Sequence, residues 1–297
     1  MLPPLPPEPK VSIHIISYNQ EAYIAEAIRS AAEQDYDNLE VVISDDGSTD
    51  HTPDIISKFE KRYPRRVVPI LNATNRGITR NSNAGLAACT GELIAFMGGD
   101  DILLPGKMAQ VAWFQEAPHR VLCAHQVEVF YEDGSRPSHP LTRRLMAGSG
   151  ADAVIRHQPF GATSVMVRSA ALPAGGFREE LPMVSDIMLW IDILAAGGEF
   201  GFVDGTFARY RKHRGNITND PFRGLGEVGR ALELTRMDYP QYADAVRYAQ
   251  VRRLAYDPGV ALLASGRKRE ARQAFLRAIR QEPTFVKAWA RLLQCYG

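Results

Sequence analysis

Short apolar runs rich in β-branched residues alternate with longer amphipathic stretches over roughly the first hundred residues. The runs that predict strands are 11–16, 39–43, 67–71 and 93–97. The first amphipathic stretch carries on one side Ala22, Tyr23, Ala27, Ile28 and Ala31. Thr52 before Pro53 predicts a second helix, with Thr52 as its N-cap, that runs to about Tyr63. Strands that alternate with helices predict βαβ units and a parallel sheet.

The pattern becomes less regular after residue 104. Pro105 predicts the start of another helix. Residues 121–131 predict a long strand that enters a turn at Asp133-Gly134, and residues 163–167 predict a further strand. The fold class expected from this order is α/β, with a Rossmann-like, mixed but mostly parallel sheet flanked by helices.

The last quarter of the chain has no strand pattern and predicts an all-α extension. Its expected helices are separated at Pro240, Asp257-Pro258-Gly259, Gly266 and Pro283. The chain thus divides into an exposed, extended proline-rich leader (1–10), a main domain (11–220) and a helical tail (221–297). The tail resembles about one and a half tetratricopeptide repeats, on the offsets of Gly259, Ala271, Phe275, Ala278, Pro283, Trp289, Leu292 and Tyr296. So few repeats need a surface to pack on, either the main domain or a partner.

Composition limits the class of protein. With 297 residues, 45% of them hydrophobic and 23% charged, the chain is globular and not disordered. The leader lacks the pattern of a secretory signal, and no apolar run approaches the roughly 20 residues that cross a bilayer. Cys89, Cys123 and Cys295 are scattered and fit neither a disulfide framework nor a zinc site. We therefore expect a cytoplasmic protein.

A net charge of +1 conceals a strong asymmetry. Residues 222–297 contain 14 Lys and Arg against 7 Asp and Glu, so the tail carries +7 and the remainder −6. A basic tail favours peripheral contact with anionic lipid at the inner face of a membrane, or with a protein, and we expect no nucleic-acid partner. The alternative is that these arginines only form the solvated faces of helices.

Polar side chains follow each of the four predicted parallel strands. In an open α/β sheet, the ligand lies outside the carboxyl ends of the strands. The residues that follow them are 17–21, 45–50, 72–80 and 98–101. Adjacent carboxylates such as Asp100 and Asp101 repel each other unless a cation, a proton or a helix N-terminus intervenes, and oxygen ligands suit Mg²⁺ or Mn²⁺ that carries substrate phosphates. Alternatively, Asp101 caps a turn and Asp45 forms an Asx-turn.

These motifs resemble glycosyltransferase family 2 in their order and spacing, over about residues 10–218. They are Ser17-Tyr18-Asn19, the segment 44–50, Asn75-Arg76-Gly77-Ile78, the segment 91–96 and Gly99-Asp100-Asp101. The resemblance implies the glycosyltransferase A-type fold, with a nucleotide-binding half (11–104) and an acceptor-side half (105–220). It also implies a sugar-nucleotide donor, Mn²⁺ or Mg²⁺ as cofactor, and inversion at the anomeric carbon.

Site residues follow from the same resemblance. The donor would contact Ser17, Tyr18, Asn19, Glu21, Asp45, Asp46, Asn75, Gly77, Arg80, Gly99 and Arg211. Asp100 would bind the metal with support from Asp101, and His213 would bind the metal or a phosphate. Two positions depart from the family pattern: Gly98 replaces the first aspartate of its Asp-x-Asp motif, and Ser82 replaces an arginine found in many relatives.

Transfer to a hydroxyl also needs a base. Residues 185–190 resemble the family's acidic pair followed by tryptophan, with Ser185 in place of the usual glutamate, which makes Asp186 the candidate base. The alternative role of Asp186 is to N-cap the helix that runs to about Gly197. Residues 210–218 resemble the family's cationic loop that closes over the diphosphate, and the alternative is a merely solvated basic loop.

The expected activity is inverting transfer of a sugar from a nucleoside diphosphate donor to a glycan or lipid-linked acceptor hydroxyl, as in polysaccharide biosynthesis. One alternative is a degenerate donor-binding scaffold whose tail recruits partners, which Gly98 and Ser185 favour. Another is a nucleotidyltransferase, which the loop after the first strand disfavours because it has neither the glycine-rich pattern nor the lysine of that class.

Overall fold

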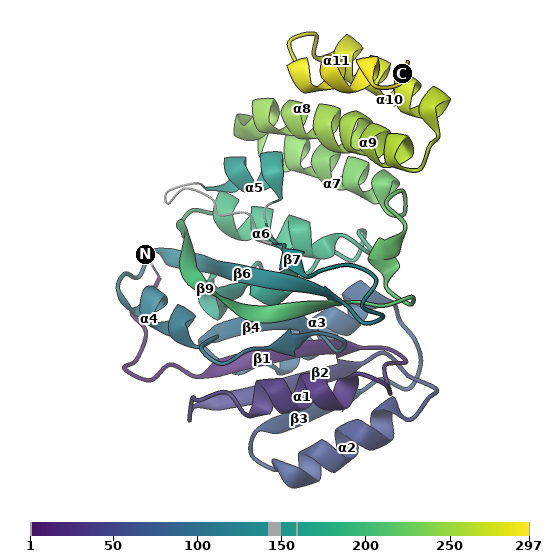
Figure 1. The fold of residues 1–297 in the computed structure, drawn as a ribbon. Coiled ribbons are helices and arrows are strands. Elements are labelled where there is room, and N and C mark those ends of the chain that lie inside the picture. Colours follow the sequence, from purple (N-terminus) through teal and green to yellow (C-terminus); the bar gives the residue numbers. More distant parts are fainter. Residues whose placement is uncertain (1, 142–149, 159, 297) are drawn as a thin grey trace. The chain divides into compact units, whose positions relative to one another are not determined.

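The computed structural model describes residues 2–141, 150–158 and 160–296 (Figure 1). Contacts divide the chain into two compact units. The first runs to Val154 and continues from Gln158 to His213, and the second comprises Ile155–His157 together with the chain from Arg214 onward. The sequence pattern places the change of domain later, near residue 220, and those domain limits stay predictions.

The first part of the first unit alternates parallel strands with helices, as predicted. The strands are β1 (Val11–Ser17), β2 (Leu39–Asp45), β3 (Val67–Leu71) and β4 (Leu93–Gly98). The helices between them are α1 (Ile24–Ala32), α2 (Thr52–Arg62) and α3 (Ile78–Ala88). Nearly every residue of β1 and β2 is buried, because the sheet is covered on both faces. Neither face of these strands is therefore polar.

The second part of the unit completes a nine-stranded mixed sheet in the order β3-β2-β1-β4-β8-β6-β9-β5, with β7 (His139–Pro140) beside β6. Strand β8 (Met166–Arg168) runs antiparallel to β4 and β6. Strand β9 (Glu199–Lys212) runs parallel to β6 (Arg120–Tyr131) and antiparallel to β5 (Ile102–Leu103). Helices α4 (Ala109–Gln115) and α6 (Ser185–Ala195) belong to this unit, whereas α5 (Ala151–His157) is divided between the two units after Val154. The predicted mixed, mostly parallel sheet is confirmed.

Several predicted boundaries are wrong. The helix expected at Pro105 begins at Ala109, because residues 105–108 form a turn with Gly106 at φ +95°. The strand expected over 163–167 begins as a 3₁₀ turn, Ala162–Ser164, and becomes strand only at Met166. Helix α2 has His51 as its N-cap, since the Thr52 hydroxyl instead accepts a hydrogen bond from the backbone N–H of Gln20 (2.8 Å). Ala22 is exposed and precedes α1.

The long strand β9 is absent from the sequence prediction. Its pairing with β6 shifts register near His125 and Gln126, and Gly205 lies in it at φ +139°. Such irregularities break the alternation by which a strand is recognised. Tyr210, Arg211 and Lys212 end this strand, so only the part of the predicted cationic loop from His213 onward lies outside it.

Most described residues of the leader are exposed, as expected, although the segment also lies against the first unit. Side chains of the domain donate hydrogen bonds to its backbone carbonyls: Arg168 to Pro3 (3.2 Å), Gln115 to Pro7 (2.6 Å), Asn38 to Glu8 (2.8 Å) and Tyr36 to Pro9 (2.6 Å). A proline-rich segment needs such donors, because its own carbonyls have few backbone N–H partners.

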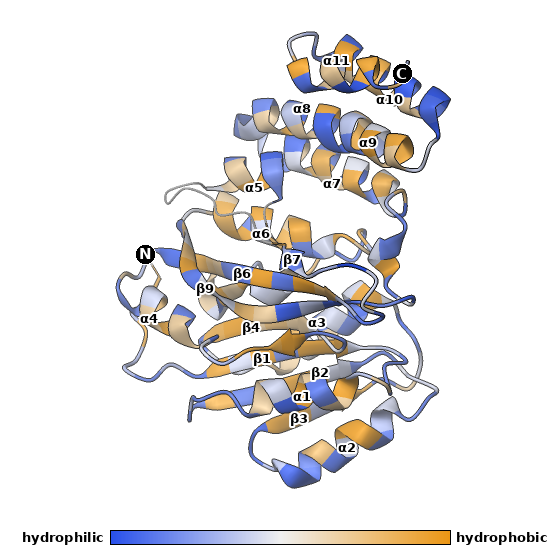
Figure 2. Cartoon of the chain, in the orientation of Figure 1, coloured by the Kyte–Doolittle hydropathy of each residue, from blue (hydrophilic) through white to orange (hydrophobic). Residues whose placement is uncertain are grey.

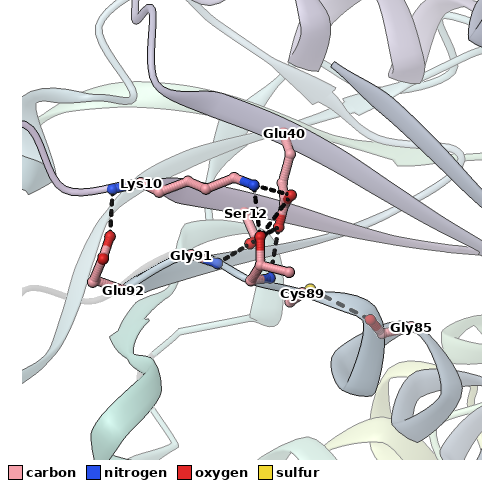
Figure 3. A network of polar contacts seen from close by, with 8 residues as sticks. Lys10, Ser12, Glu40, Gly85, Cys89, Gly91 and Glu92 are labelled. Carbon is pink, nitrogen blue, oxygen red and sulfur yellow. Dashed lines mark hydrogen bonds and ion pairs between the residues drawn. The ribbon is translucent and has the colours of Figure 1, made fainter. Parts of the chain in front are cut away.

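The buried Glu40 carboxylate holds the start of β1, at the edge of the sheet opposite the carboxyl ends of the parallel strands (Figure 3). Glu40 forms an ion pair with Lys10 (2.5 Å) and accepts hydrogen bonds from the Ser12 hydroxyl (2.6 Å) and the Thr90 N–H (2.6 Å). The Ser12 oxygen in turn accepts the N–H of Gly91 (2.8 Å). The network thereby joins β1, β2 and the segment before β4.

The regular secondary structure among the described residues from 214 onward, in the second unit, is entirely helical. It contains α7 (Leu225–Asp238), α8 (Ala243–Val251), a π-helix (Arg252–Tyr256), α9 (Asp257–Ala264), α10 (Lys268–Gln281) and α11 (Val286–Leu293). Short 3₁₀ turns lie at Ile217–Asn219 and Pro240–Tyr242. The break predicted at Asp257-Pro258-Gly259 is wrong. Pro258 has no N–H for the carbonyl four residues earlier, and the π-helix just before it accommodates this loss without ending the helix.

Helices α9, α10 and α11 share one core. A Cβ on Gly259 would lie 2.7 Å from the Phe275 ring, so glycine is what lets α9 approach α10 closely. Ala271, Phe275 and Ala278 are fully buried and Leu292 nearly so. Part of the set with repeat-like spacing therefore shares this core, whereas Trp289 and Tyr296 are exposed, and the tetratricopeptide assignment itself stays a prediction.

The three cysteines are free, in agreement with the absence of a predicted disulfide framework. Cys123 is buried, and burial raises the pKa of its thiol to about 12, so it serves as a packing residue. Among the helices of the described chain, none is both long and apolar enough to cross a membrane.

The Glu40 network predicts a pH-dependent contribution to stability. Burial acts to raise the pKa of Glu40, but the bonds from Lys10, Ser12 and Thr90 outweigh it and lower the pKa below 4.5. The stabilisation is therefore complete above the unfolded-state pKa and is lost as the pH falls through the folded-state value. We expect Glu40→Gln to reduce the free energy of unfolding by about 1–3 kcal/mol at neutral pH, and by less in acid, as measured by urea denaturation.

The matched control is Glu60→Gln, an exposed carboxylate on α2, which we expect to change stability by less than about 0.5 kcal/mol. Equal stability losses in the two variants would contradict the role given to Glu40.

Candidate active site

The parallel register of the sheet brings three strand ends to one level. Ser17 at the end of β1 lies opposite Asp45 at the end of β2, and Ile16 lies opposite Gly98 at the end of β4 (Figure 1). The polar segments that follow these strands therefore start side by side, at the edge where ligands bind in sheets of this type.

Asp45 and Asp46 hold the loops around this edge. Asp45 is buried and accepts hydrogen bonds from the Ser17 hydroxyl (2.9 Å) and from the N–H (2.9 Å) and hydroxyl (2.6 Å) of Ser48. Asp46 accepts the backbone N–H groups of Arg76 (2.7 Å) and Gly77 (2.9 Å). Asp45 thus stabilises its own turn, as the structural alternative predicts, while Asp46 ties the β3–α3 loop to the site.

The loop after β1 is tied to the loop after β2. Asn19, at φ +50°, donates its N–H to Ser48 (2.8 Å), and its amide oxygen accepts the N–H of Thr49 (2.9 Å). The Glu21 carboxylate accepts the N–H of His51 (2.9 Å). Tyr18, in the loop after β1, is 45% exposed. The two loops form one cross-linked rim, with an aromatic ring left accessible to a ligand.

Asp100, Asp101, Arg211 and His213 form a single cluster. Asp100 Oδ2 lies 3.0 Å from His213 Nε2. Both oxygens of the buried Asp101 are engaged, one by the Thr163 hydroxyl and the other by the Arg211 N–H (3.2 Å). The interpretation of Asp101 as a cap for the turn before Pro105 is therefore wrong.

Arg211 is 8% exposed, and its side chain bonds to the backbone of this cluster. Its guanidinium donates to the backbone carbonyl of Asp100 (2.9 Å) and to Glu26 on α1 (2.5 Å). The guanidinium thereby holds the backbone of Asp100 and joins helix α1 to this edge of the sheet. The direct contact with the donor that the resemblance implies for Arg211 stays a prediction.

The pKa values of two side chains at this cluster are shifted. Burial raises the pKa of Asp101 to about 7 and the adjacent charge of Asp100 adds to this effect, whereas hydrogen bonds from Thr163 and Arg211 oppose it. Burial lowers the pKa of the nearby Lys212, and the same two aspartates oppose that shift. The two adjacent carboxylates therefore repel each other when both are ionised, and a bound cation would relieve this repulsion.

Gly98 and Gly99 make room for the acidic side chains. A Cβ on Gly98 would lie 2.7 Å from Asp100 Oδ1, and one on Gly99 would overlap the side-chain oxygen of Gln20. The missing side chain at Gly98 thus lets the Asp100 carboxylate turn back over the strand end. An aspartate at position 98, the family's pattern, would require Asp100 to adopt another orientation.

A divalent cation fits Asp100 and His213. The described residues contain no group of three or more acidic, histidine or cysteine side chains arranged to hold a metal by themselves. Mg²⁺ and Mn²⁺ in nucleotide sites, however, commonly take one or two protein ligands and complete their coordination with substrate phosphates and water. Asp100 and His213 offer such a pair, and Asp100 Oδ1 lies close to where a side chain at position 98 would begin.

Tyr23 and Glu132 join this cluster although the sequence did not single them out. The Tyr23 ring lies 4.5 Å from the His213 ring and 5.0 Å from the Arg211 guanidinium carbon. Its hydroxyl donates to Glu132 (3.0 Å). Burial and this bond raise the pKa of Tyr23, so the hydroxyl keeps its proton. No local pattern could reveal a contact between residues 109 positions apart.

Asp186 lies in the first turn of α6. The N-cap of this helix is Val184, so the N-cap interpretation of Asp186 is wrong, and the Asp186 carboxylate accepts the N–H of Ile187 (2.8 Å). Ser185 is buried and its hydroxyl accepts a hydrogen bond from Thr79 on α3 (3.0 Å), a contact with no room for a glutamate side chain. Arg80, on the same helix, pairs with Glu179 (2.9 Å) at the surface and not with the strand-end carboxylates.

Together, the sheet order and the carboxylates at the strand ends define the glycosyltransferase A-type fold. Staphylococcus aureus TarS 1–349, in a structure with UDP-GlcNAc, matches it with a TM-score of 0.70 at 18% identity, over 97% of this chain and 89% of that one. The mannosyltransferase PcManGT of Pyrobaculum calidifontis, with GDP-Man and Mn²⁺, matches with a TM-score of 0.61 at 17% identity, over 99% and 88%. Residues 12–170 match the family described as Glycosyl transferase family 2, and the chain belongs to this family.

Curated proteins with similar sequences include both uncharacterized proteins and a putative glycosyltransferase. An uncharacterized protein of Mycobacterium tuberculosis is 36% identical over 219 residues, which cover 71% of this chain and 61% of the relative. The putative glycosyltransferase EpsE of Bacillus subtilis is 32% identical over 193 residues, which cover 64% and 68%. The match spans about three fifths of the mycobacterial relative's length.

The Asp100–His213 pair predicts a measurable metal site. Asp100→Asn and His213→Ala should each weaken Mn²⁺ binding in the presence of UDP by about tenfold or more, because each removes one of two protein ligands. Electron paramagnetic resonance of free Mn²⁺ measures this affinity. Asp54→Asn, which changes a carboxylate 74% exposed on α2, is the control and should bind Mn²⁺ as the wild type does. Unchanged affinity in both site variants would exclude this pair as the metal site.

Proposed function

We propose that the chain is an inverting, metal-dependent glycosyltransferase that moves a sugar from a nucleoside diphosphate donor to a hydroxyl of a glycan or lipid-linked acceptor. The observation that carries the proposal is the Asp100–His213 pair beside Gly98, at the edge where β1, β2 and β4 end, in a chain of family 2. The family and the fold supply the reaction class, and the pair supplies a place for the donor's diphosphate.

The donor's nucleoside is assigned to the cross-linked rim. Tyr18 presents an exposed ring that can stack on a base, and Asp45 and Asp46 keep the loops beneath it rigid. Asn19 and Glu21 belong to the loop after β1, and Asn75 and Gly77 belong to the β3–α3 loop, which Asp46 holds. The proposal leaves the nucleobase open, because the two matched glycosyltransferase structures contain a uridine and a guanosine nucleotide.

The diphosphate is assigned to the cluster at the end of β4. Asp100 and His213 would hold Mn²⁺ or Mg²⁺, and Asp101 supports Asp100 from below through Thr163 and Arg211. A bound divalent cation would neutralise the charge that develops on the leaving nucleoside diphosphate. Lys212 and the residues after it add positive charge on the same side.

Asp186 is the proposed base. The acceptor hydroxyl attacks the anomeric carbon from the side opposite the diphosphate and forms the new C–O bond while the old bond to the phosphate oxygen breaks. Asp186 takes the hydroxyl proton, and the nucleoside diphosphate leaves with the bonding electrons, which inverts the configuration. The first turn of α6 favours the ionised carboxylate, which is the form able to accept a proton.

A catalytically inactive donor-binding scaffold is the rival function, and Gly98 and Ser185 are the observations that favour it. The structure gives both residues a local role, since Gly98 admits the Asp100 carboxylate and Ser185 bonds Thr79. They can therefore replace the family's acidic residues without the loss of the remaining site.

Donor hydrolysis separates an enzyme from a scaffold. We expect one of UDP-, GDP-, dTDP- or CMP-sugars to raise the melting temperature with Mn²⁺ and to be hydrolysed slowly to its free nucleotide, with both effects lost on addition of chelator. Coupled detection of the released nucleotide measures turnover. A scaffold would show the thermal shift without nucleotide release.

Asp186→Asn should reduce sugar transfer by about 10²–10⁴-fold, because the amide cannot accept the hydroxyl proton. Donor affinity, measured by calorimetry, should stay within about twofold, since the base faces the acceptor. Asp54→Asn serves as the control with normal transfer. Near-normal turnover of the Asp186 variant would refute the base assignment.

A further inference from the structure

Large apolar side chains are exposed along one side of α11 and the turn that follows it. Val286 is 73% exposed, Trp289 49%, Leu293 73% and Tyr296 64%. Their spacing of three, four and three residues aligns them on a single stripe. Ala288 and Leu292, on another side of the same helix, are buried in the tail core. Helix α11 therefore has one apolar side packed and a second one in water.

Helix α10, which contacts α11, carries hydrophilic residues, blue in Figure 2, and its side outside the tail core is rich in Lys and Arg and forms the basic face of this helix. Its one acidic residue, Glu270, is already paired with Arg267 (2.5 Å). No ion pair in the described chain involves the other basic residues of this helix, which are Lys268, Arg269, Arg272, Arg277 and Arg280. The Arg272 guanidinium carbon lies 5.1 Å from the Tyr296 ring, so the basic face and the apolar stripe adjoin.

This combination restricts the partner. Isolated exposed apolar residues are ordinary, but a contiguous stripe of four large ones marks an interaction surface. Tryptophan and tyrosine beside uncompensated arginines match the boundary between lipid headgroups and acyl chains, where the ring enters the apolar layer and the guanidinium meets phosphate. A second copy of this chain fits less well, because two surfaces with the same positive charge repel each other.

We propose that the stripe on α11 and the basic face of α10 bind an anionic lipid surface. Trp289, Leu293 and Val286 enter the headgroup boundary, and the arginines of α10 contact lipid phosphates. An eight-residue helix is too short to cross a bilayer, so it lies in the interface. The proposal concerns binding only and does not depend on sugar transfer.

Sedimentation of the full chain with lipid vesicles tests the proposal. We expect binding to phosphatidylcholine vesicles that contain roughly one-third phosphatidylglycerol, little binding to phosphatidylcholine alone, and weaker binding as salt increases. Trp289→Ala with Leu293→Ala should lower the partition coefficient by about tenfold or more. Met237→Ala, which removes a side chain 61% exposed on α7, is the matched control and should bind as the wild type does.

The charge contribution has its own pair of variants. Arg269→Glu with Arg280→Glu should reduce binding by roughly tenfold or more, because lipid phosphates then face acidic groups. Arg230→Glu with Arg236→Glu makes the same change in net charge on α7 and should reduce it much less. Thermal melts show that each variant is folded.

Quenching by brominated lipid locates the inserted residue. Of the three tryptophans, Trp190 is 1% exposed and Trp113 is partly buried, so quenching by lipid should disappear in Trp289→Phe while binding persists. Equal binding to neutral and anionic vesicles, or wild-type binding by the stripe variant, would overturn the proposal. A dimer in solution that the stripe variant converts to a monomer would overturn it too, because a second copy would then cover the stripe.

Discussion

The hydrogen-bonded register of β1 between β2 and β4 is the constraint on which the candidate site depends. Because both neighbours run parallel to β1, Ser17, Asp45 and Gly98 end their strands at one level. The acidic loops then lie close enough to be cross-linked by Asp45, Asp46 and Asn19. A slip of one residue in either pairing would exchange the two buried faces of the strand and displace its end from those of its neighbours, so core packing and site geometry are secured by the same bonds.

Negative charge gathered at that edge has to be compensated, and β9 brings the compensating groups. Arg211 reaches the edge from a strand more than a hundred residues later and bonds the Asp100 carbonyl, the Asp101 carboxylate and Glu26. A carboxylate as buried as Asp101 is tolerated only with such partners. The strand also delivers His213 to Asp100. Uncharged residues in place of Arg211 would remove the guanidinium bonds to the Asp100 carbonyl and to Glu26.

The first four strands and the helices between them could be predicted because their apolar runs are continuous and their breaks are sharp. The failures have identifiable causes. Strand β9 is irregular and contains Gly205, so it lacks a clean period. Pro105 and Pro258 are both prolines at predicted helix boundaries, yet their surroundings differ. Pro105 begins a turn, whereas Pro258 lies inside a helix that stays continuous because a π-helix precedes it. Thr52 has the side chain of an N-cap, but the loop after β1 takes its hydroxyl.

The sequence by itself determined which residues carry the chemistry and that most of them follow parallel strands, since motif order and apolar period are local properties. It could not determine how the acidic residues divide their roles. Only the tertiary structure turns both Asp101 oxygens toward Thr163 and Arg211 and leaves Asp100 to meet His213. The same holds for Tyr23, whose position in the pattern indicates a core-facing helical residue and whose ring instead packs on His213. The direction of a side chain depends on partners that are distant in sequence, and no local spacing encodes them.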